Sequence, residues 1–416
     1  MNLNKGIDDY KERRKKRTIA LIGYSLPAIE AASELNYNYI CVVPEDYVSL
    51  LEADGVKALA WNFEKISQDS EKLYKRLAEL NVDFAIGLFE ETVEWAGMIN
   101  AFLFKDSRLF NHSLLFRDKA MMKRKAQMSG IRVGVFEEVD TKESAKKFFD
   151  KINEALSHLE EDIKDPVHLK PLNSAGSIGH YIIHSREDID ELEDNNFPCL
   201  AESHLDGQEF SVEAFIHNGK IMFLNINEYI RLGYSQILPP SPKLEAYRPI
   251  IQKAVEKLVK AFNVQHGIIH PEYFIDQDGD LNFGEVAKRV PGGHIFELIE
   301  QAYGFNAYQG MLLCSDPDTS ESELKLFFPD EINGKKGHAA NLLIYPHKSY
   351  VTNLQFPESL NKNKYFVKHD MFEPITPKVA ERIGFGNHYG KIVFFGDEPE
   401  QIIELLNEYE SYDFYT

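Results

Sequence analysis

The chain has 416 residues, which is too long for one ordinary hydrophobic core and predicts two or three domains. Hydrophobic residues make up 44% and charged residues 27%, a composition typical of soluble globular proteins, and no apolar run approaches the roughly 20 residues that a membrane span requires. Asp and Glu (66) outnumber Lys and Arg (46), and the net charge of -20 argues against a general surface for nucleic acids or anionic membranes.

The N-terminal basic run Lys11–Arg17 is not followed by the apolar stretch and cleavage pattern of a secretory signal, so we interpret it as a solvated lead-in to the first strand. The cysteines Cys41, Cys199 and Cys314 are scattered and lack C-x-x-C spacing, which indicates neither a disulfide framework nor a zinc site. We therefore expect a protein of the reducing cytoplasm.

The first predicted elements alternate between strand and helix. The apolar run Thr18–Gly23 leads into a helical segment at Ala28–Ala32, and strand character returns at Tyr39–Val43 and Phe84–Leu88. A helix is predicted over Glu90–Phe104, with acidic residues in its first turn. Strands separated by helices predict a parallel sheet, and the first strand-to-helix turn, GYSLPA, lacks the G-x-G-x-x-G pattern of a dinucleotide site.

A basic amphipathic helix is predicted after Asn111, ending at Ser129-Gly130, and we place the first domain boundary just before it. Lys142–Leu159 is predicted to be a charged helix. Over residues 166–225, strands such as VHLKP, HYIIHS, CLAES, EFSVEAFI and KIMFLNI alternate with glycine turns, which predicts an antiparallel sheet. Another helix is predicted over Tyr247–Phe262.

The segment HPEYFIDQDGDLNFGEVAKRVPGGH is the most informative part of the chain. If Asp278-Gly279 forms a two-residue turn, the register places Glu272 directly opposite Glu285. Opposed Cβ atoms lie about 5 Å apart, and two carboxylates there repel each other unless a cation lies between them. We expect this cation to be Mg²⁺.

The same register predicts that Phe274 lies across from Phe283. Lys288, Arg289 and the turn Pro291–Gly293 then add positive charge and free backbone amides, which are suited to phosphate chemistry. An exposed acidic hairpin with ordinary surface charges would also carry this pattern.

The remaining elements complete the chain. Ile295–Leu313 is predicted to be one helix, and Cys314–Ser320 a polar linker. Phe328–Thr416 is predicted to be a small mixed domain, with strands NLLIYP and KIVFFG and a closing helix near Glu400–Tyr409.

Two further features are suited to nucleotide binding. Lys170 precedes the loop Ser174–Gly179, whose amides and hydroxyls could cradle phosphate oxygens, although a small Gly/Ser hairpin loop has the same composition. Glu202 and Glu209 bracket a predicted Asp206-Gly207 hairpin. Either carboxylate could accept hydrogen bonds from ribose hydroxyls or organise an adenine pocket, and solvated strand-end charges are the alternative.

The order of these motifs resembles the ATP-grasp superfamily over residues 18–315. The motifs are RDK at 117–119, LKP and SAGSIG at 169–179, ESHLDGQEFSVE at 202–213, and HPEYFID followed by GEVAKRVPGGH. The resemblance implies an α/β (α+β multi-domain) ATP-grasp fold. It comprises a parallel α/β domain over 1–112, an ATP-grasp domain over 113–315 with an antiparallel lid subdomain at about 130–203, and a small mixed domain over 316–416.

Carried over residue by residue, the resemblance implies a binding site for ATP. Glu202 would lie on the hinge strand beside adenine, Glu209 would bind ribose, and the Ser174–Gly179 loop would close over the triphosphate. The complete set implied to bind ATP is Lys119, Lys170, Ser174, Gly176, Ser177, Gly179, Glu202 and Glu209.

The resemblance also implies that Glu272 and Glu285 hold Mg²⁺, as two ions, with Mn²⁺ as an alternative. Arg289 and Lys170 would act catalytically on the transferred phosphoryl group. Many ATP-grasp enzymes carry Asn two residues after the second metal-binding glutamate, whereas this chain has Ala287, which cannot coordinate a cation. The E-V-A-K-R form with the following glycines is similar to the branch of bacterial L-amino acid ligases, which make dipeptides.

Fewer residues indicate the substrate. Gly292, Gly293 and His294 are predicted to contact it, although a histidine at a helix start is as often structural. Glu90 could pair with a substrate ammonium group, and a helix N-terminus would favour the same residue. His270, two residues before Glu272, is predicted only to support the metal site.

The predicted reaction is ATP-dependent ligation, in which a small-molecule carboxylate forms an acyl phosphate and an amine then displaces phosphate. Both substrates are expected to be amino acids, and the resemblance implies a homodimer. Transfer of the acyl group to a thiol, such as the phosphopantetheine arm of a carrier protein, is the alternative within the family. A biotin-dependent carboxylase component is disfavoured because the chain has no A-M-K-M segment. An ATP-binding regulator without catalysis is the alternative of another class, and the complete residue set weighs against it.

Overall fold

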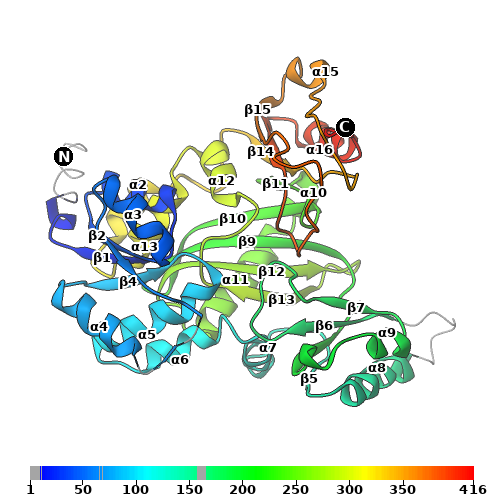
Figure 1. Cartoon of the computed structure of the whole chain (residues 1–416), viewed down its shortest axis with the longest axis horizontal. Coiled ribbons are helices and arrows are strands. Elements are labelled where there is room, and N and C mark those ends of the chain that lie inside the picture. The colour runs from blue at the N-terminus through cyan, green and yellow to red at the C-terminus, as the bar shows by residue number, and fades with distance from the viewer. Residues whose placement is uncertain (1–9, 11, 65, 68, 157–164) are drawn as a thin grey trace.

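The computed structural model of the chain describes residues 10, 12–64, 66–67, 69–156 and 165–416 (Figure 1). The strands of these residues form an N-terminal parallel sheet, a central eight-stranded sheet and a second four-stranded sheet. In Figure 1 the second four-stranded sheet lies at the lower right, and the C-terminal helices lie at the top right. No helix in the described residues is long and apolar enough to cross a membrane.

The N-terminal sheet is parallel, as predicted, with the strand order β3-β2-β1-β4. Its strands are β1 (Thr18–Ile22), β2 (Asn38–Val43), β3 (Ala58–Ala60) and β4 (Phe84–Gly87). Its helices are α2 (Leu26–Glu34), α3 (Glu45–Ala53), α4 (Ser70–Glu79) and α5 (Val93–Phe104), with a 3-10 turn at Glu90–Thr92. Ile19 and Leu21 face one core, while Ala20 and Ile22 face another, because a parallel sheet is covered on both faces.

Two helices connect this unit to the rest of the chain. They are α6 (Arg108–Leu114) and α7 (Lys119–Met128), and α7 confirms the predicted basic helix. The side chain of Asp118 caps α7 by accepting a hydrogen bond from the backbone N of Met121 at 2.8 Å.

The second four-stranded sheet, which we call the lid sheet, is antiparallel with the order β5-β8-β6-β7. It consists of β5 (Phe136–Val139), β6 (Val167–Pro171), β7 (Tyr181–Ile183) and β8 (Cys199–Ser203). Helices α8 (Lys142–Leu156) and α9 (Arg186–Asp190) pack against it around Phe148, Leu169 and Ala201. The predicted helix over 142–159 is confirmed to residue 156, and residues 157–159 lie outside the described part of the chain.

The central sheet has the order β13-β12-β9-β10-β11-β14-β16-β15. Its first strands are β9 (Gln208–His217), β10 (Lys220–Arg231), β11 (Ser235–Leu238), β12 (His266–Ile275) and β13 (Leu281–Ala287). Helices α10 (Pro242–Glu245) and α11 (Arg248–Ala261) follow β11, so the predicted 247–262 helix is confirmed. Phe215 faces the core beneath α12 (Ile295–Tyr303) and α13 (Ala307–Ser315). Ala214 faces α11 on the other side of the sheet.

The prediction of one antiparallel sheet over residues 166–225 was wrong, because these strands belong to two sheets. β6, β7 and β8 form the lid sheet, while β9 and β10 belong to the central sheet. Asp206-Gly207 therefore links the two sheets and is not a hairpin turn. Gly207 has φ +109°, and an added Cβ would lie 2.1 Å from the carbonyl oxygen of Ile275.

The β12–β13 hairpin has a longer loop than the predicted two-residue turn. Ile275 pairs with Leu281, and a carboxylate oxygen of Asp276 accepts hydrogen bonds from the backbone N of Asp278 and of Asp280, at 3.1 and 2.9 Å. These bonds stabilise a loop over residues 276–280, in which Gly279 has φ +81°.

The predicted register is consequently wrong next to the loop and correct farther away. Phe274 pairs with Asn282 instead of Phe283. A bulge between Pro271 and Tyr273 then restores the predicted register, in which Pro271 pairs with Val286. Glu272 lies in this bulge, so it is not directly opposed to Glu285 as predicted.

The predicted helix over 295–313 is two helices, α12 (Ile295–Tyr303) and α13 (Ala307–Ser315), separated at Gly304 with φ +77°. The predicted polar linker over residues 314–320 is confirmed for residues 316–320, which connect α13 to α14 (Glu321–Phe327), whereas Cys314 and Ser315 lie in α13. Asp316 in this linker is buried. Asp316 accepts hydrogen bonds from Tyr37 and Arg17 of the N-terminal unit.

The C-terminal strands extend the central sheet. The elements are α14 (Glu321–Phe327), β14 (His338–Leu343), α15 (Glu358–Asn361), β15 (Phe366–Met371), β16 (Gly390–Gly396) and α16 (Pro399–Glu410). β14 pairs with β11 and continues through β16 to β15, all antiparallel. The predicted strand KIVFFG and closing helix are confirmed. The predicted domain boundaries near residues 113 and 316 remain predictions.

Candidate active site

A cavity of about 560 Å³ lies between the central sheet, the lid sheet and the C-terminal segment. Its lining includes most residues that the sequence nominated: Lys119, Lys170, Ser174, Gly176, Ser177, Glu202, Glu209, Glu272, Glu285, Arg289, Gly292, Gly293 and His294. Gly179 and Glu90 are not part of the lining. Its volume lies within the range of roughly 300–1,000 Å³ that is usual for small-molecule sites.

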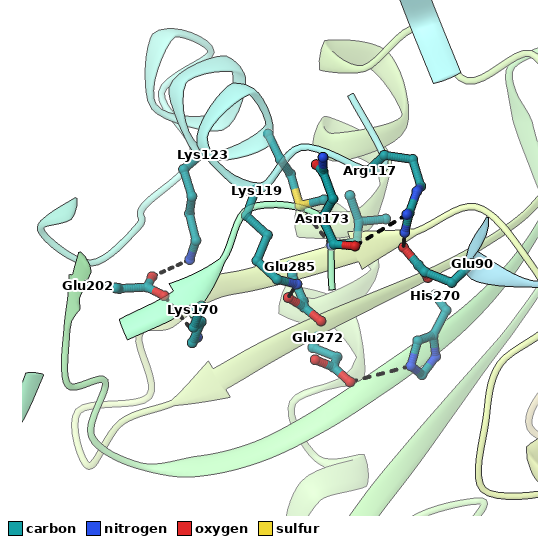
Figure 2. Close-up of polar contacts among 12 residues, drawn as sticks. Glu90, Arg117, Lys119, Lys123, Lys170, Asn173, Glu202, His270, Glu272 and Glu285 are labelled. Carbon is teal, nitrogen blue, oxygen red and sulfur yellow. Dashed lines mark hydrogen bonds and ion pairs between the residues drawn. The ribbon is translucent and has the colours of Figure 1, made fainter. Parts of the chain in front are cut away.

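The two glutamates of the hairpin already have partners in this structure (Figure 2). The Nζ of Lys119 donates to Glu285 at 2.5 Å. Burial alone would raise the pKa of Glu285, but the charges of Lys119 and Lys170 lower it to about 2. Glu272 accepts from the Tyr229 hydroxyl at 3.2 Å and lies 3.5 Å from Nε2 of His270. Both carboxylates therefore face cationic or hydrogen-bonding groups across the same cavity.

His270 contacts Glu272, one of the two glutamates. It is buried, and its Nδ1 lies 3.0 Å from the buried carboxylate of Glu213. Burial disfavours the imidazolium, yet hydrogen bonds to Glu213 and Glu272 raise the pKa of His270 to about 9. His270 therefore lies between Glu213 and Glu272. Its role in supporting a metal site remains a prediction.

The glutamates fit a magnesium ion shared with a substrate. No group of three or more His, Cys, Asp or Glu side chains in the described ranges is arranged to hold a metal ion by itself. Mg²⁺ is typically held by one or two carboxylates together with substrate phosphates and water. The donor set of Glu272 and Glu285, with Ala287 contributing nothing, is of this kind.

Glu202 is fully buried between two lysines. The carboxylate pairs with the Nζ of Lys123 and, at 3.0 Å, with the Nζ of Lys170 (Figure 2). Burial would raise the pKa of Glu202, but the two lysine charges reverse the shift and hold it at about 2. The sequence analysis missed Lys123. Lys123 follows Lys119 by one helical turn on α7, so the two side chains lie on the same face of the helix. This spacing could have indicated that Lys123 also faces the site.

The pairing of Glu202 makes the fold sensitive to acid. Glu202→Gln removes the counter-charge of Lys123, which is buried, and of Lys170, which is partly buried, so we expect the free energy of unfolding at pH 7 to fall by about 3–5 kcal/mol. The folded-state pKa is below the ordinary 4.5, so the carboxylate stabilises the protein above pH 4.5 and this contribution is lost as the pH falls toward 2. Urea unfolding at pH 7 and pH 3 measures both effects.

The wild type should therefore lose more stability between these pH values than Glu202→Gln does. The control is Glu191→Gln, at an exposed position of the lid region, which should change the free energy of unfolding by less than about 0.5 kcal/mol. Equal acid sensitivity of the wild type and Glu202→Gln would contradict this account.

Glu209 has the opposite electrostatic environment. It lies on β9 opposite Phe274 of β12. Burial and the nearby Glu272 charge raise the pKa of Glu209 to about 8, against the attraction of Lys170. A carboxyl group accepts hydrogen bonds from hydroxyl groups, and its protonated form, which these surroundings favour, can also donate one.

Arg289 is held by the N-terminal unit. Its Nε donates to Glu90 at 2.6 Å, and the other oxygen of Glu90 accepts from Nη1 of Arg117 at 2.7 Å. Glu90 therefore neutralises two arginines at the edge of the cavity. The sequence predicted Glu90 as a partner for a substrate ammonium group, and the structure shows it in ion pairs within the protein.

The loop Ser174–Gly179, which we call the glycine loop, connects β6 and β7. Gly176, Ser177 and Gly179 all have φ between +59° and +71°. The base of the loop is attached to α7, because the backbone N of Lys119 donates to the carbonyl of Leu172 at 3.0 Å.

Sequence reasoning also missed three histidines on the cavity wall. The two ring nitrogens of His168 lie 2.8 Å from Nε2 of His180 and 2.9 Å from Nδ1 of His204. Burial, with the Lys170 charge second, lowers the pKa of His168 to about 3 and of His180 to about 4. His168 and His180 flank recognised motifs and His204 lies within one, but only the pairing of β6 with β7 and β8 brings the three together.

The wall opposite the lid sheet is formed by β11, β14 and the start of α12. Ser235 and Asn341 are buried there, and the Oγ of Ser235 and the Oδ1 of Asn341 have no hydrogen-bond partner in the part of the chain that the structure describes. His294 has φ +61°, and burial together with Lys391 lowers its pKa to about 4. No local sequence pattern indicated Ser235 or Asn341.

Comparison with known proteins identifies the domain that carries this site. Residues 163–296 match the ATP-grasp domain family. The chain therefore contains an ATP-grasp domain and has the ATP-grasp fold, as the sequence resemblance predicted. The crystal structure of an L-amino acid ligase from Bacillus licheniformis superposes with a TM-score of 0.70 at 20% identity, covering 94% of this chain and 96% of that one.

Two curated relatives are similar in sequence. An L-arginine-specific L-amino acid ligase from Bacillus subtilis is 25% identical over 264 residues, which are 58% of this chain and 60% of that protein. A D-alanine–D-alanine ligase from Natranaerobius thermophilus is 22% identical over 272 residues, which are 59% of this chain and 69% of that protein. The chain thus matches less than two thirds of the length of the first relative.

Proposed function

We propose that this chain is an ATP-dependent ligase that joins the carboxylate of one amino acid to the amine of another, with release of ADP and phosphate. The observation that carries the proposal is the convergence of two carboxylates, Glu272 and Glu285, with Lys119, Lys170 and Arg289 around one cavity. This set is suited to a polyphosphate and its divalent cation. The similarity to an L-arginine-specific L-amino acid ligase and a D-alanine–D-alanine ligase supports amino acids as the substrates.

The nucleotide would lie on the lid side of the cavity. Glu202 lies near the end of β8, the last strand of the lid sheet before the chain enters the central sheet. It pairs with the ammonium group of Lys170, which could donate a hydrogen bond to a phosphate oxygen or a base nitrogen. Glu209, with its raised pKa, is suited to ribose hydroxyls. The glycine loop borders this side with backbone amides, which can donate hydrogen bonds to phosphate oxygens.

The phosphate end of the nucleotide would meet the acidic hairpin. Glu272 and Glu285 would hold Mg²⁺, as one or two ions, and Mn²⁺ could replace it. Bound Mg²⁺ would supply Lewis-acid neutralisation of the phosphate oxygens. Lys119 is paired with Glu285 in this structure, and its ammonium group would pair with the phosphates when ATP is bound. The guanidinium of Arg289 would contact the transferred phosphoryl group.

The proposed chemistry has two displacement steps. A carboxylate oxygen of the first substrate attacks the γ-phosphorus in line. The bond between the γ-phosphorus and the β-phosphate oxygen breaks, so ADP departs and the first substrate becomes an acyl phosphate. The amine nitrogen of the second substrate then attacks the acyl carbon, loses a proton and displaces inorganic phosphate. No protein nucleophile is required, so the side chains act by neutralising charge and positioning the reactants.

The two substrates would occupy the half of the cavity beneath β11 and β14. Ser235 and Asn341 each contribute a buried polar atom that has no partner among the described residues, and a carboxylate or ammonium group could satisfy it. Gly292 and Gly293 keep this part of the wall free of side chains, and His294 borders it.

The test is to measure phosphate release from ATP and Mg²⁺ against all pairs of the common amino acids and to read product masses in the same wells. Phosphate release with a condensed mass would support the proposal and identify both substrates. Wells without amine and wells with a chelator are the controls. Phosphate release that yields an acylated carrier-protein thiol would instead favour the thiol alternative, and ATP binding without any ADP formation would favour the regulator.

A further inference from the structure

The segment Glu381–His388, which we call the C-terminal loop, precedes β16 and meets the glycine loop across the cavity. Four of its residues, Phe385, Gly386, Asn387 and His388, line the cavity. The backbone N of Phe385 donates to the carbonyl of Gly176 at 3.0 Å. A Cβ added to Gly384 would lie 2.1 Å from the same carbonyl oxygen, so the two backbones are in direct contact.

The side chain of Arg382 fixes the shape of this loop. Its guanidinium carbon lies 3.9 Å from the ring centre of Tyr345 and 4.3 Å from that of Tyr234. Its Nε donates to the carbonyl of Gly384 at 2.9 Å, and the Tyr345 hydroxyl donates to the carbonyl of Phe385 at 2.8 Å. Cation–π contacts of a partly desolvated arginine are among the stronger interactions available to a surface loop.

The aromatic rings that hold Arg382 belong to the central sheet region. Tyr234 lies in the turn between β10 and β11, and Tyr345 follows β14. The ring of Phe385 covers Gly233 in the same turn, where an added Cβ would lie 2.2 Å from it. The loop is therefore attached to rigid strands on one side and to the glycine loop on the other.

We propose that Arg382 is a positioning residue that holds the C-terminal loop against the glycine loop, so that the two loops together exclude water from the substrate half of the cavity. The proposal rests on the ligase function proposed above. An acyl phosphate is open to attack by water, whose oxygen would add to the acyl carbon, release phosphate and regenerate the carboxylate. Closure of both loops directs this intermediate toward the amine.

The first measurement is the amount of condensed product formed per ADP. Arg382→Gln removes the cation but keeps hydrogen-bonding groups, and we expect the ratio to fall about fivefold while ADP formation continues. Arg382→Lys keeps a cation over the rings and should recover most of the ratio. Gly384→Ala, which places a Cβ against the Gly176 carbonyl, should also lower the ratio while the side chain of Arg382 is retained. The matched control is Arg108→Gln, because Arg108 is 87% exposed and pairs locally with Asp106.

The second measurement is independent of ligation. Hydrogen–deuterium exchange with a non-hydrolysable ATP analogue and Mg²⁺ should be faster over residues 174–179 and 384–388 in Arg382→Gln than in the wild type, and unchanged in Arg108→Gln. Unchanged exchange, or faster exchange with an unchanged product ratio, would overturn the positioning role. If the wild type forms no condensed product with any pair, the ligase function fails, and the exchange measurement still decides whether Arg382 holds the loops together.

Discussion

Glu285→Gln is expected to lower ATP turnover by about a thousandfold or more. The amide keeps the size and polarity of the side chain but removes the negative charge that would face a divalent cation and that now faces Lys119. Steady-state ADP formation over a range of Mg²⁺ concentrations measures the loss.

The fold should survive this substitution. The Glu285 side chain is 35% exposed, so its ion pair with Lys119 is partly hydrated, and the melting temperature should fall while the protein stays folded at the assay temperature. Asp280→Asn, on the same hairpin and 66% exposed, is the matched control and should keep turnover within about twofold of the wild type. Wild-type turnover by Glu285→Gln would remove the hairpin from the proposed site.

Arg289→Ala is expected to reduce kcat by about a hundredfold to a thousandfold with little change in ATP affinity. The guanidinium would act on the transferred phosphoryl group, whereas the adenine and ribose contacts assigned to Glu202 and Glu209 are elsewhere in the cavity. Separate measurements of kcat, of KM for ATP and of equilibrium nucleotide binding test this division.

Two further variants define what Arg289 contributes. Arg289→Lys keeps the charge but not the Nε that donates to Glu90, so it should recover only part of kcat. Arg132→Ala, at a 53% exposed arginine on the outer side of the hairpin, should behave like the wild type. A large rise in KM for ATP with unchanged kcat would instead make Arg289 a nucleotide-binding residue.

Local sequence patterns were sufficient for most elements of the fold. Ile19 and Ala20 face two different cores because a parallel sheet is covered on both faces. The continuous apolar run Thr18–Gly23 was the sequence feature that predicted this burial. The basic amphipathic pattern that ends at Ser129-Gly130 marked α7, and the helix over 247–262 that contains α11 was also predicted. The separation of β8 from β9 was not visible, because Asp206-Gly207 suits a sheet-to-sheet link as well as a hairpin.

The glutamate pair shows why a partly wrong register can still locate a site. The longer loop shifts the pairing by one residue, and the bulge at Glu272 shifts it back, so both carboxylates still line the cavity. The two-residue turn expected at Asp278-Gly279 led to the wrong pairing next to the loop, and the bulge could not be predicted from the turn. Partners supplied by other elements, such as Ser235 and Asn341, depended on long-range contacts that no local pattern records.

The pairing of β11 with β14 has a consequence for shortened forms of the protein. All four residues of β11, Ser235–Leu238, are buried, and their outer hydrogen bonds go to residues 339–342. A chain that ended near residue 316 would expose β11 as an unpaired edge, with Ile237 and Leu238 newly in contact with water. Such an edge is a template for strand addition between molecules, so a truncated protein that kept every predicted ATP ligand would be prone to aggregate.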